Sequence, residues 1–191
     1  MGRIVITEFV SLDGVMEAPG GGEPFKHAGW TFTINRGEEG DKFKLEETLA
    51  SEALLLGRVT YEAFAAAWPS ERNAFADKFN SMPKYVVSST LEKAEWNNST
   101  ILRGNVAEEA SKLRRESSGD IVVHGSAQLV QTLIEQDLVD ELRLMVFPVV
   151  LGSGKRLFGE TRDKKCLRLV DSKAVGDGVV ILIFQPRREA D

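Results

Sequence analysis

Three short segments of the chain carry residue types that bind phosphate groups, and each follows a run of apolar residues. Arginine combines a fixed positive charge with a fork of donors that fits phosphate, and the free N–H groups at a helix start attract anions. Taken singly, each segment is better explained as a tight turn, a helix cap or a polar loop. Together they predict a site for a phosphate-rich ligand, formed by Gly57, Arg58, Thr60, Ser88, Ser89, Thr90, Gly125, Ser126, Ala127 and Gln128.

The signatures of the commonest nucleotide sites are absent from the sequence. No G-x-G-x-x-G segment is present, which argues against a standard Rossmann dinucleotide site. The segment 152–155, Gly-Ser-Gly-Lys, matches a P-loop only in part. Val149 occupies the position of the first glycine, and Arg156 occupies that of the Ser or Thr. Hydrolysis of nucleoside triphosphates is therefore disfavoured.

Two aspartates are the candidates for a proton donor. Asp13 lies in an Asp-Gly turn, where such a residue usually only shapes the turn. Asp41 lies near the start of an expected helix, where a carboxylate also favours the helix dipole. Position alone does not choose between Asp13, Asp41 and a bound water. His27 and His124 lack a carboxylate cluster at ligand spacing, so no metal site is expected.

Aromatic residues offer candidates for a pocket that holds a flat ring. Trp30, Tyr61 and Phe64 are the residues assigned to this role. Aromatic side chains at helical spacing are more often part of the core, which is the alternative explanation. The single cysteine, Cys166, precedes an apolar strand and is expected to serve packing rather than nucleophilic chemistry.

Hydrophobic periodicity predicts the elements that position these residues. Strands are expected at 3–10, 53–56, 85–88, 100–102, 120–124 and 141–150, and helices at 38–52, 59–68, 71–80, 106–116 and 126–136. Residues 167–185 are expected to form two further strands around the turn 176–178. This alternation predicts the α/β class, with a largely parallel sheet covered on both faces and an antiparallel pair at its end. Ligands bind at the carboxyl ends of the strands in such sheets.

Composition is that of an ordinary soluble protein. The chain has 191 residues, 42% hydrophobic and 28% charged, which predicts one domain spanning 1–191. A net charge of -5 makes nucleic acid and anionic membrane poor partners. The apolar stretch 144–151 is too short to span a bilayer. A single cysteine and an N-terminus without the apolar core of a signal peptide predict a cytoplasmic protein.

Five segments occur in an order that resembles the dihydrofolate reductase-like superfamily. Within it, they are most similar to the bacterial group of the riboflavin-biosynthesis reductase, the C-terminal domain of RibD. The segments are 11–15 (Ser-Leu-Asp-Gly-Val), 55–62 (Leu-Leu-Gly-Arg-Val-Thr-Tyr-Glu), 86–89 (Val-Val-Ser-Ser), 123–126 (Val-His-Gly-Ser) and 148–154 (Pro-Val-Val-Leu-Gly-Ser-Gly). The resemblance covers nearly the whole chain, and the ordered set is more specific than any one segment.

This resemblance implies a three-layer fold with a mostly parallel, eight-stranded mixed sheet and a C-terminal antiparallel strand pair. NADPH would lie across the strand ends. By similarity, Gly57, Arg58 and Thr60 would hold the cofactor phosphates, and Ser88 and Ser89 would bind the adenosine 2′-phosphate. The segment 125–128 would cradle the pyrophosphate at a helix start. The loop 11–16, which contains Gly14, would close over the nicotinamide and the substrate.

Three positions depart from the reductase pattern. Asp41 falls near the acidic residue that dihydrofolate reductases carry on the first long helix, but the surrounding helix differs. Met145 stands where those enzymes have a pterin-contacting threonine, and it is assigned to the substrate pocket. Ser126 replaces the second glycine of the usual pair. The zinc motif of the fused deaminase is absent from the sequence.

The resemblance and the phosphate-binding segments together predict a reductase that transfers hydride from NADPH to a small heterocyclic substrate. A ribosylaminopyrimidine of riboflavin biosynthesis, a pterin and an unrelated C=N or C=O compound all remain open as substrates. The alternative is a non-catalytic NADP(H)-binding protein that kept the nucleotide site. The departures from the reductase pattern at Asp41 and Met145 favour this alternative. A flavodoxin-like flavin carrier is disfavoured, because the turn at 11–14 is short and acidic for a phosphate loop.

The end of the chain predicts a homodimer. Residues 179–184 are apolar on both faces, and a strand at the end of a chain often lies at a sheet edge. A symmetry-related copy is the simplest cover for such an edge. An interior position for this strand is the alternative. The resemblance favours the dimer, because riboflavin-type reductases are usually dimeric.

Overall fold

The computed structural model describes residues 1–187, which form eight strands and five α-helices. The strands are β1 (Arg3–Ser11), β2 (Ser51–Gly57), β3 (Lys84–Val87), β4 (Ser99–Leu102), β5 (Asp120–Val123), β6 (Glu141–Phe147), β7 (Leu167–Val175) and β8 (Val179–Pro186). The helices are α1 (Gly37–Ala50), α2 (Arg58–Ala67), α3 (Ala74–Ser81), α4 (Val106–Glu116) and α5 (Ala127–Glu135). Two short 3-10 helices, η1 (Trp30–Thr33) and η2 (Trp68–Ser70), complete the set.

The predicted elements match the observed ones closely, and local chemistry explains where the ends differ. The strand expected at 141–150 ends at Phe147, because Pro148 follows and cannot donate a backbone hydrogen bond. The helix expected from residue 71 begins at Ala74, because the Asn73 side chain accepts the Ala76 N–H and caps the helix there.

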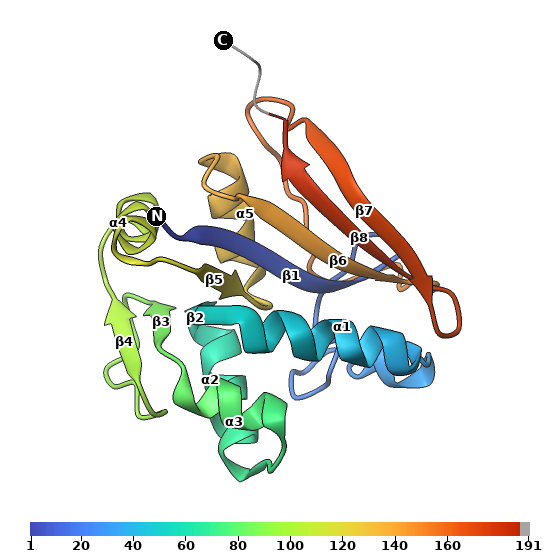
Figure 1. Cartoon of the computed structure of the whole chain (residues 1–191), viewed down its shortest axis with the longest axis horizontal. Coiled ribbons are helices and arrows are strands. Elements are labelled where there is room, and N and C mark those ends of the chain that lie inside the picture. The colour runs from blue at the N-terminus through green and yellow to red at the C-terminus, as the bar shows by residue number, and fades with distance from the viewer. Residues whose placement is uncertain (188–191) are drawn as a thin grey trace.

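All eight strands belong to one sheet in the order β4-β3-β2-β5-β1-β6-β8-β7 (Figure 1). Neighbours from β4 to β6 are parallel, and β8 is antiparallel to both β6 and β7. The α/β class and the eight-stranded mixed sheet with its antiparallel C-terminal pair are therefore confirmed.

Helices cover both faces of the sheet, and β1 contributes alternate residues to the two layers. Ile4 and Ile6 pack in one cluster with residues of α4 and α5. Val5 packs in a second cluster with residues of α2 and α3, and Thr7 contacts Glu47 of α1. Because successive strand residues point to opposite faces, Glu8 is placed on the α5 side of the sheet.

The sheet opens between β1 and β5 at the point where the strand order reverses. β1 pairs with β5 only over Arg3–Ile6, whereas it pairs with β6 from Val5 to Ser11. β5 ends at Val123, and the chain then turns away through Gly125 and Ser126, both with positive φ. No strand of the described chain therefore pairs with the β5 side of β1 beyond Ile6. Such a switch point is where open α/β sheets bind their ligands.

The two C-terminal strands are arranged in the sheet in a different order from the one assumed in the dimer prediction. β8 is hydrogen-bonded to β6 on one side and to β7 on the other, so the apolar strand is interior. The edge on this side of the sheet is β7, whose residues are exposed from Arg168 to Ala174. The argument from an apolar edge at 179–184 is thus wrong. Within residues 1–187, no helix has the length and apolar character needed to cross a membrane.

Candidate functional site

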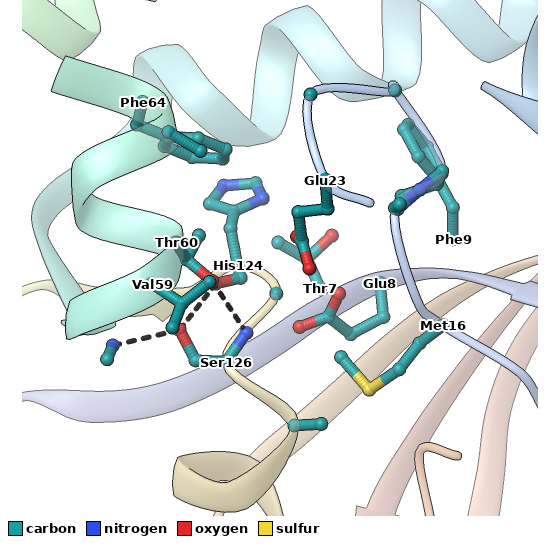
Figure 2. A pocket seen from close by; sticks show the side chains of 18 of the residues that line it. Thr7, Glu8, Phe9, Met16, Glu23, Val59, Thr60, Phe64, His124 and Ser126 are labelled. Atoms are coloured by element: carbon teal, nitrogen blue, oxygen red, sulfur yellow. Dashed lines mark hydrogen bonds between the residues drawn. The ribbon is translucent and has the colours of Figure 1, made fainter. Parts of the chain in front are cut away.

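A cavity of about 1200 Å³ lies at the opening between β1 and β5. Its lining comes from the carboxyl ends of β1, β2, β3 and β5, from the starts of α2 and α5, from α1 and from the loop after β1. Figure 2 shows the side chains of Thr7, Glu8 and His124 in this cavity, with Phe64 and Met16 on opposite sides. The switch point of the sheet therefore contains a cavity that is lined by both polar and apolar side chains.

All ten residues predicted to bind phosphate line this one cavity, although they come from three distant segments. The carboxyl ends of parallel strands meet at one edge of a sheet, and this explains the convergence. The ten are Gly57, Arg58, Thr60, Ser88, Ser89, Thr90, Gly125, Ser126, Ala127 and Gln128.

Two helix starts face the cavity without a side-chain cap. Within the described residues, no side chain caps the first N–H groups of α2 or of α5. Asn73 and Asn105 do cap α3 and α4. The first N–H groups of a helix have no partner within the helix, and they carry the positive end of its dipole. The cavity thus presents two sets of backbone donors suited to anionic groups.

The hydroxyls of Thr60 and Ser126 join the two helix starts to each other. Ser126 N–H donates to Thr60 Oγ1 at 2.9 Å, and Gly57 N–H donates to Ser126 Oγ at 2.8 Å (Figure 2). Ser126 Oγ also donates to the His124 carbonyl at 3.1 Å. A Cβ atom on Gly125 would lie 2.8 Å from Thr60 Oγ1. These hydrogen bonds shape the site because they fix the position of the α2 start relative to the α5 start.

The turn after β3 is held by its own side chains. Ser88 Oγ accepts the N–H groups of Thr90 at 3.2 Å and Leu91 at 2.9 Å. Arg103 donates to the carbonyls of Ser89 and Leu91. Arg103 had not been identified from the sequence, because it follows β4 and reaches this turn only through the parallel pairing of β3 with β4. Arg58, directly after the neighbouring strand β2, forms an exposed ion pair with Glu62 at 3.0 Å.

The two aspartates considered as proton donors differ in position. Asp41 lines the cavity, where its exposed carboxylate pairs with Arg36 at 2.6 Å. Asp13 is outside the cavity lining within the described chain. It accepts hydrogen bonds from the Ser11 hydroxyl and from the N–H groups of Leu151 and Gly152. These bonds, that from Ser11 first, lower the pKa of Asp13 to about 2, so it has no proton to donate at neutral pH.

Of the five residues predicted to contact substrate, only Phe64 lines the cavity as described. Trp30 and Met145 are buried in a separate core cluster beside the terminal strands. Tyr61 is also buried, and its hydroxyl accepts the Trp96 N–H at 3.0 Å. Gly14 lies in the turn after β1, where its carbonyl accepts the Leu157 N–H. Burial in the core, which aromatic residues at helical spacing commonly adopt, accounts for Trp30 and Tyr61.

Glu8 is the most unusual cavity residue that sequence reasoning missed. Its side chain lines the cavity although the residue is only 4% exposed. Burial raises its pKa well above the ordinary value, and this outweighs a hydrogen bond with the Gly125 backbone and the attraction of Lys44. Its Oε1 atom finds no hydrogen-bond partner in residues 1–187. A signal existed in the sequence, because Glu8 interrupts the apolar strand at 4–10.

His124 and Lys44 complete the buried polar part of the cavity. The His124 ring lies 5.3 Å from that of Phe79 and 6.2 Å from that of Phe64, measured between centroids. Burial, reinforced by the positive charge of Lys44, holds the pKa of His124 well below its usual value, so the imidazole is neutral. Lys44 donates to Thr7 Oγ1 at 2.8 Å and forms a buried ion pair with Glu47.

The loop after β1 forms one wall of the cavity. All residues from 16 to 23, including three consecutive glycines, belong to the lining. Lys155 pairs with Glu17 at 3.6 Å and with Glu23 at 3.5 Å, and it also lines the cavity. These ion pairs tie the loop to the segment that follows β6, which local sequence gave no reason to expect.

Comparisons with known proteins agree with this geometry. The model of the RibD C-terminal domain family matches residues 3–181. The uncharacterized protein YyaP of Bacillus subtilis (strain 168) is 29% identical over 191 residues, covering 95% of this chain and 94% of YyaP. A Shewanella sp. PV-4 protein assigned to riboflavin biosynthesis superposes with a TM-score of 0.79 at 19% identity, covering 97% of this chain and 99% of that one.

A third similarity concerns the fold alone. A dihydrofolate reductase from Enterococcus faecalis, solved with NADP(H), superposes with a TM-score of 0.60 at 16% identity, and each chain is covered to 97%. The predicted dihydrofolate reductase-like fold is therefore confirmed. The match of the family model across nearly the whole chain shows that this protein belongs to the RibD C-terminal domain family.

Proposed function

We propose that this protein is an NADPH-dependent reductase of a small heterocyclic substrate. The observation that carries the proposal is the cavity at the β1/β5 opening, which joins two uncapped helix starts to the aromatic side chains of Phe64 and Phe79. Membership in the RibD C-terminal domain family supports it, as does the shared fold with a dihydrofolate reductase solved with NADP(H).

The residues present fit a dinucleotide with three phosphate groups. The start of α5 would bind the pyrophosphate through the N–H groups of Ala127 and Gln128. Arg58 and Ser89, which lie just after the paired strand ends Gly57 and Val87, would take the 2′-phosphate. The reduced nicotinamide supplies a hydride when bound. The buried region around Phe64 and His124 would exclude water from the reacting atoms.

Cofactor preference is the first test. Arg58 should favour the 2′-phosphate, so calorimetric titration is expected to show tighter binding of NADPH than of NADH. The Arg58→Ala variant should bind NADPH at least about tenfold more weakly, since a hydrogen bond to a charged group contributes about 1.5–3 kcal/mol. NADH affinity should change little in the same variant.

The matched control is Arg115→Ala, which removes an exposed arginine from α4, outside the cavity lining of residues 1–187. Its affinity for NADPH should equal that of the unmodified protein. Equal affinity for NADPH and NADH would remove the role given to Arg58. Tight NADPH binding without oxidation of NADPH by any acceptor would instead favour the non-catalytic binding protein.

A further inference from the structure

The strongest unexplained feature of the cavity is the carboxyl group of Glu8. The strand β1 carries it on the α5 side, next to the turn at Gly125. In Figure 2 the carboxyl group lies in the cavity between Ser126 and Met16. One of its oxygens is buried without a partner in residues 1–187. A carboxyl group in this condition costs free energy of folding, which suggests that it is retained for a task.

The charges around Glu8 do not offset burial, which raises its pKa and favours the protonated form. From α1, Lys44 attracts the carboxylate form, but Glu47 repels it and neutralises Lys44 in a buried ion pair. His124, directly after β5, is neutral. In the loops, Lys155 forms ion pairs with both Glu17 and Glu23. Burial therefore remains the largest influence on the pKa of Glu8. Phosphates bound at the start of α5 would add negative charge nearby and favour the protonated form further.

The other acids near the cavity are less suited to giving up a proton there. Asp13 is ionised and is held by the turn after β1. Asp41 is 65% exposed and pairs with Arg36. Glu8 is the buried acid of the described cavity lining, and a general acid works best when its proton is present at the operating pH.

We propose that Glu8 is the general acid of the reaction, an inference that rests on the proposed reductase function. The acceptor carbon of a C=N or C=O bond receives a hydride from the reduced nicotinamide, and the Glu8 proton passes to the nitrogen or oxygen of that bond. The π bond breaks while one C–H bond and one N–H or O–H bond form. The acceptor gains the two electrons that the dihydronicotinamide loses. Glu8 is left as a carboxylate and regains its proton from water.

The test compares the unmodified protein with Glu8→Gln, Glu8→Asp and the control Glu46→Gln, which neutralises an exposed glutamate of α1. NADPH affinity is measured first, by fluorescence titration. Difference infrared spectra between the unmodified protein and Glu8→Gln then report the protonation of Glu8. Turnover is followed by NADPH absorbance with dihydrofolate, a phosphoribosylaminouracil and the cyclic imine pyrroline as acceptors.

Glu8→Gln should bind NADPH within about twofold of the unmodified protein, because the cofactor contacts are unchanged. Its kcat should fall by about 10²–10⁴-fold, the usual contribution of general acid catalysis. The decline of kcat at high pH should disappear, since glutamine does not titrate. Glu8→Asp should recover part of the activity, and Glu46→Gln should match the unmodified protein in every measurement.

Three results would overturn the assignment of Glu8. These are an infrared signal showing Glu8 ionised at neutral pH, a kcat for Glu8→Gln within a few-fold of the unmodified protein, and no turnover of any acceptor by a protein that binds NADPH. Failure of the unmodified protein to bind NADPH is a separate outcome. It would overturn the proposed reductase function itself, and the acid step with it.

Discussion

Burial shifts the pKa values of two residues of the cavity lining, Glu8 and His124, toward the neutral form, yet they make stability depend on pH in opposite directions. The histidine resists gaining a proton, and the glutamate resists losing one. A titration of stability can therefore separate them, provided that each is removed in turn. Both effects follow from the position of these residues at the β1/β5 opening.

Replacing His124 should change how the free energy of unfolding depends on pH below neutral. Its folded pKa lies below the ordinary value of 6.5, so the unfolded chain binds the additional proton as pH falls below about 6.5. The contribution of His124 to the free energy of unfolding should therefore decrease between neutral pH and about pH 5. His124→Gln should lack this part of the decrease, as measured by urea denaturation across the pH range.

Glu8→Gln provides the contrast for that measurement. The raised pKa of Glu8 contributes stability that is present below the ordinary value of 4.5 and lost as pH rises through the folded value. The stability of Glu8→Gln relative to the unmodified protein should thus increase with pH above 4.5. A His124→Gln profile parallel to that of the unmodified protein would contradict the burial of a neutral imidazole.

At the scale of the elements, the site depends on the junction between α2 and α5. Gly125 has φ of 55°, and Ser126 of 61°, so two consecutive left-handed residues turn β5 into α5. The Thr60 and Ser126 side chains then lock this turn to the start of α2. Neither helix start needs a capping side chain if a ligand satisfies its N–H groups.

Gly125→Ala should disrupt this junction. The added Cβ would lie 2.8 Å from Thr60 Oγ1, and a left-handed conformation costs a residue with a side chain about 1–2 kcal/mol. We expect the free energy of unfolding to fall by about 1–3 kcal/mol, measured by chemical denaturation. NADPH affinity should fall at least about tenfold, because the α5 start would shift relative to α2.

Gly20→Ala is the matched control for stability. Gly20 is also a cavity glycine, but its φ is not positive, and an added Cβ would meet no atom of the described residues within 4 Å. Its unfolding free energy should remain within about 0.5 kcal/mol of that of the unmodified protein. If Gly125→Ala behaves like Gly20→Ala, the proposed role of the junction is wrong.

At the scale of the whole molecule, the homodimer remains a prediction. The strand expected to form the contact between the two copies is now β7 rather than β8. The outer edge of β7 pairs with no strand of the described chain, and its neighbouring side chains Leu169 and Val170 are 50% and 47% exposed. An exposed edge strand with apolar residues readily pairs with another copy. Light scattering at micromolar concentration should give twice the 21.1 kDa of one chain.

Val170→Lys should shift this assembly to monomers, because a charge on an edge strand opposes pairing. Leu49→Lys is the control, since Leu49 is 49% exposed on α1, away from β7. It should leave the mass unchanged. A mass near that of one chain in the unmodified protein, independent of concentration, would exclude the dimer.

The amino-acid sequence by itself determined the elements, the fold class and the three polar turns that are predicted to bind phosphate. These features are local: a run of apolar, β-branched residues specifies β1, and the Asn105 cap specifies the start of α4. The convergence of the turns also follows from sequence, because parallel strands bring their carboxyl ends to one edge.

Only the tertiary structure decided which acid is in a position to donate a proton. The pKa of Asp13 is lowered by the Ser11 hydroxyl and then by backbone N–H groups 138 and 139 residues away, whereas the pKa of Glu8 is raised because burial removes its carboxyl group from water. Likewise, the Ser126 N–H group donates a hydrogen bond to Thr60 Oγ1, although the two residues are 66 positions apart in the sequence. The pKa and the hydrogen-bond partners of a side chain depend on burial and on groups that are distant in sequence, and these arise only when the chain is folded.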